Sequence, residues 1–403
     1  MPSTRHCAAL LIACCLASGW LAPVVARAAP PPPADAASRP SVTADAAVLI
    51  DARTGRVLYA KSADTPRAPA STTKMMTALI ALEQGNLAAS VTVGPRAAAT
   101  PGSSAGLRAG ERYTLGALLR GLLLRSGNDA AVAIADHIAG SVQAFAALMN
   151  ARAQALGLQN THFVNPHGLT EPFHYSSAYD LARIARAGLS LPTFAAIVDS
   201  ATARISGYDR LQRAFHRELR NTNRLLLAYD WIDGVKTGTT RAAGNCLVAS
   251  GSRGGLRLIA VVLHSDHRWG DALRLLQWGF IHFSDRTLAA GDVVGRIPVR
   301  DTLQPGEQID AVSAQTLAMP VALSELPRTH LRLQLPTTLR APVRAGQVLG
   351  TAELERAGEV LGRVPLVART SMPRAPWYLR WWRKAWPWSA RTQSTVRSAP
   401  PSQ

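Results

Sequence analysis

Pro69-Ala-Ser-Thr-Thr-Lys-Met-Met-Thr77 opens a segment whose apolar residues recur with helical spacing until Gly85. Residues three apart on a helix share a face, so this pattern is expected to hold the Ser71 hydroxyl and the Lys74 amine within hydrogen-bonding reach. Serine is a poor nucleophile until a base removes its proton, and lysine is a poor base until burial or a second cation lowers its pKa. The stretch therefore indicates a serine nucleophile paired with a lysine base.

Two short motifs farther along the chain can complete such a site. Ser126-Gly-Asn128 lies between predicted helices at 115–124 and 129–138, where it can present a hydroxyl and an amide into a cleft. Lys236-Thr-Gly238 supplies a candidate second cation and a glycine that lets a strand approach a substrate closely. The chain has only four lysines among its 44 basic residues, and two of them, Lys74 and Lys236, fall in the opening stretch and in the last motif. The ordered set S-x-x-K, S-x-N and K-T-G is typical of serine β-lactamases and penicillin-binding proteins.

Longer stretches make the likeness more specific. The sequence resembles the low-molecular-mass penicillin-binding proteins of the D-alanyl-D-alanine carboxypeptidase type, serine peptidases of the bacterial cell wall. The resemblance runs from about Ala46 to the C-terminus. It implies an α/β (α+β) catalytic domain of the β-lactamase/transpeptidase type, with an antiparallel sheet packed between helices, followed by a small all-β domain and an amphipathic C-terminal helix. The stretches that carry it are 69–77, Asn165-Pro-His-Gly-Leu169, His174-Tyr-Ser-Ser-Ala178 and Asp233-Gly-Val-Lys-Thr-Gly-Thr239.

The resemblance also implies catalytic roles. Ser71 would attack the carbonyl of the penultimate D-Ala of a peptidoglycan pentapeptide, forming an acyl-enzyme and releasing the terminal D-Ala, and β-lactam antibiotics would acylate the same serine. Lys74 would be the general base, and Ser126 would relay protons toward the leaving amine. No cofactor and no metal are implied.

Substrate contacts follow from the same resemblance. Asn128 would hold the amide on the acyl side, and Thr237 with Lys236 would bind the terminal carboxylate. Backbone N–H groups of Ser71 and Thr239 would form the oxyanion hole. The implied substrate-binding residues are Asn128, Lys236, Thr237, Gly238, Thr239 and Arg268.

Both ends of the chain indicate export to a membrane surface. A basic start, an apolar run over 7–25 and the small-x-small site Ala26-Arg-Ala28 predict a signal peptide, which places the mature protein at the periplasmic face of the cytoplasmic membrane. Cys246 is then the one cysteine left, so no intrachain disulfide is expected. The expected divisions are a signal peptide (1–28), a Pro/Ala-rich linker (29–44), a catalytic domain (45–284), a β-rich domain (285–370), and an anchor with a tail (371–403).

The anchor is predicted from aromatic and basic residues. Five of the nine tryptophans lie between Trp377 and Trp388, and a helical wheel separates them from the cations. A helix of ten residues spans about 15 Å, half a hydrocarbon core, so it would lie on an anionic membrane rather than cross it. The alternative is an aromatic helix docked on the protein's own core. The proposed contacts are Trp377, Trp381, Trp382, Trp386, Arg380, Arg383 and Lys384.

Net charge alone is a poor guide to the partner. The formal charge is +18 and 47% of residues are apolar, which excludes an acidic disordered chain. Residues 371–403 hold five Arg, one Lys and no acid, so +6 of that charge lies beside the tryptophans. An exported chain seldom meets nucleic acid, so no nucleic-acid partner is expected, and the sequence leaves the oligomeric state open.

Three other functions fit parts of the same pattern. A class A β-lactamase needs a deacylating glutamate between Ser126 and Lys236, and neither Glu171 nor Glu218 lies in a Glu-x-x-Leu-Asn setting. A D,D-endopeptidase that cleaves cross-links would use the same site, and a non-enzymatic peptidoglycan-binding protein with a vestigial site is a third possibility.

Two further groups of residues are expected to have structural roles. The three histidines His162, His167 and His174 lack H-E-x-x-H spacing, so a loop bordering the site is favoured over a zinc site. Cys246, on a predicted strand, is expected to be a core residue rather than a reactive thiol.

Overall fold

The central element is a five-stranded antiparallel sheet in the order β2-β1-β9-β8-β7. The computed structural model describes residues 39–385 of the chain. Two apolar runs on either side of turn residues 51–55 predict a hairpin over 46–58, and the apolar runs at 245–250 and 256–263 predict a pair of strands. The structure contains both. The strands are β1 (Ala46–Asp51), β2 (Val57–Lys61), β7 (Ile232–Thr240), β8 (Gly244–Arg253) and β9 (Leu256–Leu263).

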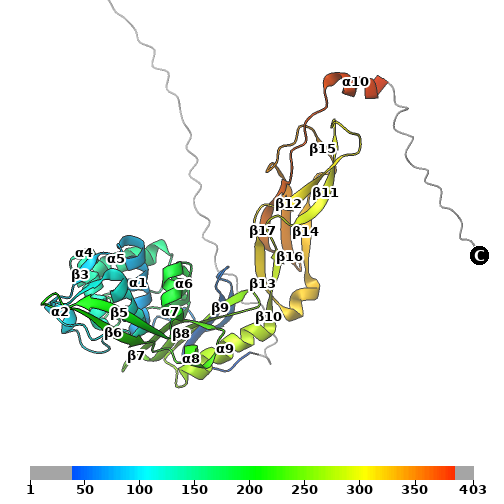
Figure 1. Ribbon diagram of the computed structural model, residues 1–403. Helices are drawn as coiled ribbons and strands as arrows, with labels where there is room; N and C mark the ends of the chain where they lie inside the picture. The colour runs from blue at the N-terminus through cyan, green and yellow to red at the C-terminus, as the bar shows by residue number, and fades with distance from the viewer. Residues whose placement is uncertain (1–38, 386–403) are drawn as a thin grey trace, which may run out of the picture.

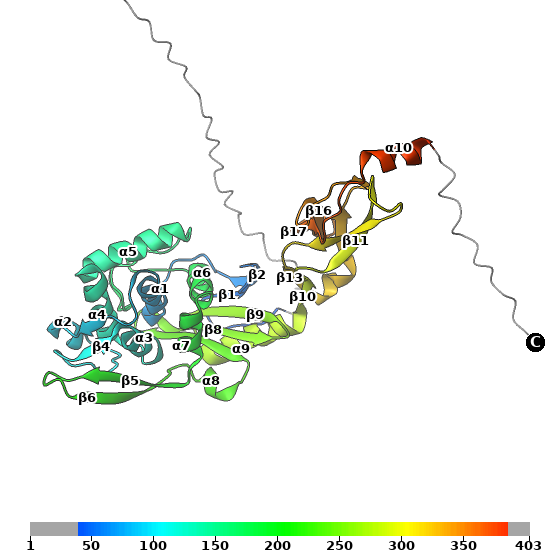
Figure 2. The ribbon, with the colours of Figure 1, turned by 45° about the horizontal axis from the view of Figure 1, so that its top comes forward.

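Helices cover both faces of this sheet (Figures 1 and 2). Alternate residues of β1 point to opposite faces, so Val48 packs in one apolar core and Leu49 in the other. Both faces are covered, and β1 and β9 accordingly read as nearly continuous apolar runs. The first core lies under α1 (Lys74–Gln84), α2 (Pro95–Ala98), α3 (Leu115–Leu124), α4 (Asn128–Ala139), α5 (Val142–Ala155), α6 (Ala178–Leu189) and α7 (Pro192–Asp199). The second lies under α8 (Leu225–Ala228) and α9 (Arg268–His282).

Two local features differ from the expectation. The helix expected to start at Ser71 instead begins with a 3-10 turn, η2 (Ala70–Thr73), and becomes α-helical only at Lys74. A four-stranded sheet that was not predicted lies at the far side of the helices. Its strands contain few apolar residues, and three of them carry arginine, so the sequence gives only a weak strand pattern. They are β3 (Ser90–Thr92), β4 (Arg112–Thr114), β5 (Thr202–Tyr208) and β6 (Ala214–Arg220).

A β-rich domain follows α9 directly and projects away from the catalytic domain (Figure 1). It contains a six-stranded sheet in the order β14-β16-β17-β12-β11-β15 and a separate pair, β10 with β13. The strands are β10 (Phe283–Leu288), β11 (Val293–Arg300), β12 (Gln308–Ser313), β13 (Leu317–Ala322), β14 (Thr329–Gln334), β15 (Leu339–Arg340), β16 (Val348–Arg356) and β17 (Glu359–Ala368).

The two domains meet through arginines of the β1–β2 turn. Arg53 Nη2 donates to Asp285 Oδ1 at 2.8 Å, and its Nη1 donates to the backbone oxygen of Ala318. Arg56 donates to the backbone oxygen of Pro320. These contacts join the turn to both strands of the β10–β13 pair.

The last described element is α10 (Trp377–Ala385), at the end of the β domain farthest from the catalytic domain (Figure 1). Within residues 39–385, no single helix is long and apolar enough to cross a membrane. The predicted signal peptide, most of the linker, and Trp386 lie outside the described residues.

Candidate active site

Ser71 lies in a tight turn at the start of α1. The preceding residue, Ala70, is buried and has a φ of +47°, a conformation that L-residues seldom adopt. Ser71 itself is half-buried, and its Oγ lies 2.9 Å from Lys74 Nζ. The structure therefore brings the hydroxyl and the amine together at the mouth of the site.

Lys74 is fully buried and has three oxygen neighbours. Besides Ser71 Oγ, its Nζ lies 2.7 Å from Asn128 Oδ1 and 2.6 Å from the backbone oxygen of His167. Burial, reinforced by the charge of Lys236, holds the pKa of Lys74 well below its usual value. A neutral amine suits this environment because its two N–H groups can donate to Asn128 and His167 while its lone pair accepts the Ser71 proton.

Ser126 and Asn128 lie at the junction of α3 and α4. Ser126 has a φ of +59°, and its buried hydroxyl has no hydrogen-bond partner within residues 39–385. Asn128 was expected to hold the substrate amide. In the structure its amide group is already engaged at both ends, since Oδ1 accepts from Lys74 and Nδ2 donates to the Pro101 backbone oxygen at 2.6 Å. The Nδ2 group carries a second hydrogen, which remains available to a substrate beside the Pro101 contact.

The edge strand β7 forms the opposite wall. Lys236 is buried, and burial together with the nearby Arg268 lowers its pKa to about 7. Thr237 Oγ1 lies 2.8 Å from Thr222 Oγ1. Arg268, the first residue of α9, donates from Nη1 to Thr239 Oγ1 at 2.7 Å and to the Gly238 backbone oxygen at 3.0 Å. Cationic and hydroxyl donors thus gather at one end of β7.

The structure shows a second reason why residue 238 is a glycine, besides the predicted approach to a substrate. Its predicted role was to let a strand approach the substrate. A Cβ at this position would lie only 3.0 Å from Ala70 Cβ and from the Ser71 backbone nitrogen. The glycine therefore allows β7 to approach the turn that carries Ser71.

The loop with the three histidines holds α1 from the other side. Thr77 Oγ1 donates to the Pro166 backbone oxygen at 2.6 Å, and Thr73 Oγ1 lies 2.9 Å from His174 Nε2. Burial lowers the pKa of His167 to about 3 and that of His174 to about 4, so both rings are neutral near pH 7. Within the described chain, no group of three His, Cys, Asp or Glu side chains could hold a metal ion.

Gly168 of this loop gives the first testable prediction. Its φ is +87°, and an added Cβ would lie 1.9 Å from the Ala70 backbone oxygen. We expect Gly168→Ala to lower the free energy of unfolding by about 2–4 kcal/mol, from backbone strain plus a clash that must be relieved by backbone movement. Acylation of Ser71 should slow at the same time. Denaturant unfolding and a labelling assay measure the two effects.

Gly140 is the matched control. It has a similar φ of +76° at the end of α4, but an added Cβ would meet no atom within 4 Å. Gly140→Ala should cost only the strain of the left-handed conformation, about 1 kcal/mol, and leave acylation unchanged. Equal effects in the two variants would show that Gly168 is not pressed against the nucleophile turn.

Two buried aspartates that support the site were not predicted from the sequence. Asp271 is buried in the first turn of α9 and accepts from Thr43 Oγ1 at 2.7 Å, Ala44 N at 3.0 Å and Ser265 Oγ at 2.7 Å. Burial acts to raise the Asp271 pKa, but the hydrogen bonds from Ser265, Thr43 and Arg274 outweigh it and lower the pKa to about 2. This carboxylate fixes the helix end that positions Arg268. The one feature of the sequence that could have indicated Asp271 is its place as an acidic residue in the first turn of a predicted helix.

Asp129 plays a corresponding role at α4. Its carboxylate accepts from the backbone nitrogens of Ala105 and Leu107, each at 3.0 Å, and so holds that loop against the start of α4 beside Asn128.

Cys246 on β8 is fully buried, and burial raises the pKa of its thiol to about 11, so it is a core residue, as predicted.

Together, Ser71, the buried Lys74 and the second lysine, Lys236, form a group of side chains suited to serine acyl transfer on a helix-covered antiparallel sheet. A family described as D-alanyl-D-alanine carboxypeptidase matches residues 33–267, and one described as the C-terminal domain of penicillin-binding protein 5 matches residues 283–374. The chain belongs to the D-alanyl-D-alanine carboxypeptidase family.

Individual relatives agree with this assignment. The chain is 36% identical to D-alanyl-D-alanine carboxypeptidase DacF of Bacillus subtilis over 342 residues, covering 82% of this chain and 86% of that one. It is 35% identical to DacA of Escherichia coli, covering 84% and 86%.

Solved structures give the same result for the fold. Penicillin-binding protein 5 of Haemophilus influenzae superposes with a TM-score of 0.66 at 32% identity, covering 83% of this chain and 99% of that one. The Streptomyces K15 DD-transpeptidase superposes with a TM-score of 0.58 at 36% identity, covering 60% and 99%. The predicted fold class, an α/β catalytic domain followed by an all-β domain, is confirmed.

Proposed function

We propose that this protein removes the terminal D-Ala from peptidoglycan pentapeptides through an acyl-enzyme on Ser71, and that β-lactams acylate the same serine. The observation that carries the proposal is the fully buried Lys74 amine, 2.9 Å from Ser71 Oγ, with its two other contacts made to oxygen acceptors. Such an amine has a lone pair directed at the serine proton and can act as its base.

The acylation step then runs as a balanced transfer. Ser71 gives its proton to Lys74 while its Oγ attacks the carbonyl carbon of the penultimate D-Ala. Backbone N–H groups of Ser71 and Thr239 face the developing oxyanion. The proton passes through Ser126 to the leaving nitrogen, the C–N bond breaks, and D-alanine departs. Water, deprotonated by Lys74, hydrolyses the ester.

The substrate carboxylate is assigned to the open end of β7. Lys236 supplies charge from below the strand, while Thr237, Thr239 and Arg268 offer hydrogen-bond donors at its surface. Donors of this kind bind a carboxylate with charge-assisted hydrogen bonds. Asn128 would bind the acyl-side amide with the second hydrogen of its Nδ2, beside the one donated to the Pro101 oxygen.

Two assays on the full mature chain test the function. Fluorescent penicillin reports acylation, and a muropeptide pentapeptide reports D-alanine release. We expect stable labelling and D-alanine as a product. Absence of labelling would refute the acyl-enzyme. Labelling with cleavage of cross-links but no D-alanine release would instead assign the chain as a D,D-endopeptidase.

The pH dependence of acylation is the second prediction. Lys74 must be neutral, so the rate rises with pH through its lowered pKa. Lys236 must be protonated to attract the carboxylate, so in the free enzyme the rate falls as pH rises through about 7. Arg268 lowers the Lys236 pKa, so Arg268→Gln should move the alkaline limb to higher pH even as it reduces the overall rate. An alkaline limb at the same pH in Arg268→Gln would contradict the assignment to Lys236.

We further propose that the mature protein is exported and rests on the periplasmic face of the cytoplasmic membrane through α10. The proposed divisions are the signal peptide 1–28, the linker 29–44, the catalytic domain 45–284, the β domain 285–370 and the anchor 371–403. The exposure of the aromatic residues supports the anchor, since each of Trp377, Tyr378, Trp381 and Trp382 is more than half exposed. That exposure disagrees with a helix docked by its aromatic face on the protein's own core.

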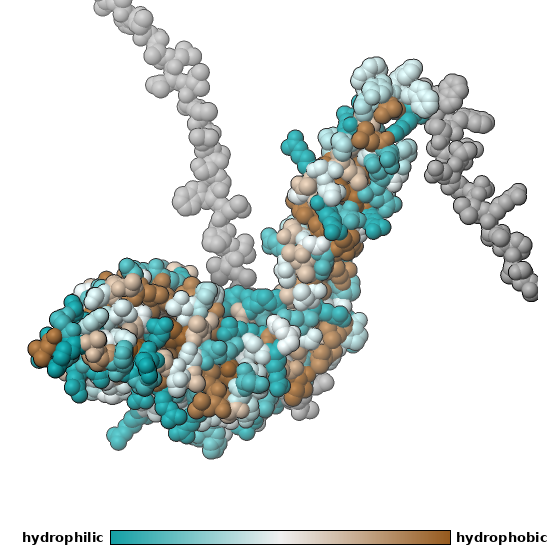
Figure 3. Space-filling model, viewed as in Figure 1, coloured by the Kyte–Doolittle hydropathy of each residue, from teal (hydrophilic) through white to brown (hydrophobic). Residues whose placement is uncertain are grey.

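The basic side of α10 differs in part from the expectation. Arg383 was expected to face lipid, but it donates to the backbone oxygens of Thr302 and Leu303 in the β domain. It therefore fixes the helix and leaves the aromatic side outward. Figure 3 shows this end of the molecule mostly in pale colours, as expected for Trp and Tyr, whose hydropathy is intermediate.

Removal of the helix is the third prediction. The truncation should begin at residue 377, because Met372 and Ala375 still form backbone hydrogen bonds with Val343 and Asp301 of the β domain. We expect a chain that ends at Pro376 to move from the membrane pellet to the soluble fraction with its D-alanine release unchanged. Fractionation of cells tests this, and a truncated chain that still pellets with membranes would refute the anchor.

A further inference from the structure

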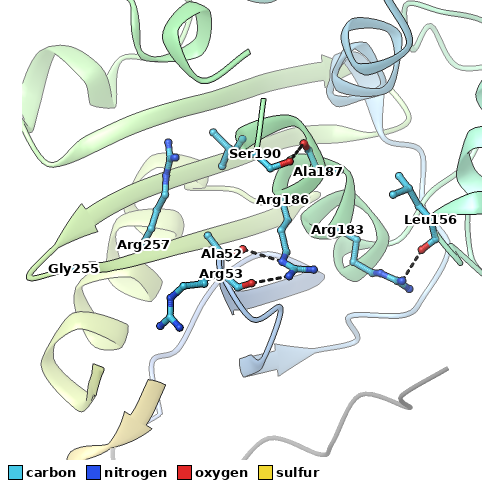
Figure 4. A pocket seen from close by; sticks show the side chains of 10 residues that line it. Ala52, Arg53, Leu156, Arg183, Arg186, Ala187, Ser190, Gly255 and Arg257 are labelled. Carbon is cyan, nitrogen blue, oxygen red and sulfur yellow. Dashed lines mark hydrogen bonds between the residues drawn. The ribbon is translucent and has the colours of Figure 1, made fainter. Parts of the chain in front are cut away.

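A pocket with a volume of about 540 Å³ lies away from the catalytic centre (Figure 4). It is formed by α6, the β1–β2 turn and the start of β9. Pairing of β7 with β8 places Gly238 opposite Cys246, whereas the β8–β9 turn begins at Arg253. Seven residues of strand separate the two positions along β8, which is about 23 Å at the rise of an antiparallel strand. The pocket is therefore at the opposite end of the central sheet from Ser71.

Arginines dominate the lining. Arg53, Arg183, Arg186 and Arg257 are four of its ten lining residues, and no Asp or Glu is among them. The chain has 40 arginines in 403 residues, obtained by subtracting its four lysines from 44 basic residues, so ten residues would hold about one. The background abundance of arginine does not account for this concentration.

Carboxylates neutralise only part of the charge. Arg53 pairs with Asp285 at 2.8 Å, and Arg257 pairs through Nε with Asp233 Oδ2 at 3.0 Å. Arg183 and Arg186 bond only to backbone oxygens within the described chain. A carbonyl satisfies an N–H group but does not cancel the positive charge. The charge of Arg183 is partly compensated, because it acts to lower the pKa of the nearby Asp180, whose net pKa burial raises. Arg186 has no carboxylate partner among the described residues, and the two guanidinium groups lie three residues apart on one face of α6, where like charges repel.

Donors remain for a ligand. In Figure 4, Arg186 points to the carbonyls of Ala52 and Arg53 through Nε and Nη2, and Arg183 points toward Leu156. Each guanidinium has five N–H groups, so the Nη1 group of Arg186 and the two Nη groups of Arg257 have no partner in residues 39–385. Leu156, Leu189 and Ala187 also line the pocket and give it an apolar part.

From this arrangement we propose that the pocket is a second binding site, which takes a small multivalent oxyanion. Guanidinium groups bind planar carboxylates and phosphates with paired hydrogen bonds, and a concave site with an apolar part suits an organic anion. A phosphate ester and a polycarboxylate share this chemistry. The competing hypothesis is that the arginines only fix the chain turns whose carbonyls they contact.

Calorimetric titration of the full mature chain with pyrophosphate and with citrate, at constant ionic strength, tests the site. We expect saturable one-to-one binding that Arg257→Gln weakens roughly tenfold or more, because a charge-assisted hydrogen bond is lost. Arg183→Lys keeps the charge but loses the paired geometry, and it should weaken binding as well. Binding of pyrophosphate alone would identify the ligand class as phosphate, and binding of citrate alone as carboxylate.

Two control variants show whether the anion binds in this pocket or elsewhere on a basic chain. Arg120→Gln removes an exposed arginine from α3, outside the pocket, and should leave binding unchanged. Arg268→Gln removes a cation from the proposed carboxylate site of the catalytic centre and reports any anion binding there. Absence of saturable binding, an equal loss in Arg120→Gln, or a loss in Arg268→Gln but not in Arg257→Gln would overturn the proposal. The unfolding temperature of each variant without ligand confirms that the chain is folded.

Discussion

Replacing Ser71 with alanine is expected to abolish labelling by fluorescent penicillin and to lower D-alanine release by roughly 10⁴-fold or more. The covalent intermediate needs an oxygen at this position, and the neighbouring hydroxyl of Thr72 is committed to the Pro69 backbone oxygen at 2.6 Å. The fold should persist because Ser71 is half-buried and, within residues 39–385, its hydroxyl has no hydrogen-bond partner other than Lys74. Gel fluorescence, a D-alanine assay and thermal unfolding measure the three quantities.

Ser200 offers a matched control for that substitution. It is a partly exposed serine outside the site, and its hydroxyl donates to the Ala196 backbone oxygen at 2.7 Å. Ser200→Ala should label like the parent chain. Residual labelling of Ser71→Ala at the parent level would place the nucleophile elsewhere and remove the basis of the proposed function.

Replacing Lys74 with methionine is expected to slow acylation by about 10²–10⁴-fold, the range attributed to a general base. Methionine has a similar length but no lone pair on nitrogen, so the Ser71 proton has no acceptor. Lys74→Arg should fail to restore the rate, because a guanidinium stays protonated and cannot accept a proton. The measurement is the second-order rate constant for labelling.

The two Lys74 variants separate the base from the charge. If the charge of Lys74 were what mattered, arginine would preserve the rate and methionine would not. If the buried amine is the base, both are slow. A methionine variant with a rate within a few-fold of the parent would exclude Lys74 as the base.

The contact between Ser71 and Lys74 could be predicted from the sequence because its geometry is local. Ser71 and Lys74 are three residues apart at a helix start, and short range fixes their separation whatever the rest of the chain does. The hairpin over β1 and β2 was readable for the same reason. The confirmed fold class rested on longer stretches that resemble a known family.

Contacts between residues far apart in the chain could not be predicted from the sequence in this way. Gly238 approaches Ala70 across the sheet, and Gly168 approaches the same residue from a distant loop. No pattern in the sequence tells which backbone a glycine will meet. Asn128 stays a predicted substrate ligand, but its contact with Pro101 could not be foreseen because it depends on a loop packed by tertiary structure. The β5–β6 hairpin was missed because its strands are mostly exposed and rich in arginine.

If α10 rests on a membrane as proposed, the elongated β domain sets the height of Ser71 above that membrane. Its strand β17 has ten residues, about 33 Å at an extended rise, and α10 lies at the end opposite the catalytic domain. With α10 resting on lipid, Ser71 would work at a set height above the bilayer. Glycan strands closer to the lipid would pass beneath its reach, and a shorter or longer β domain would select a different depth of the cell wall.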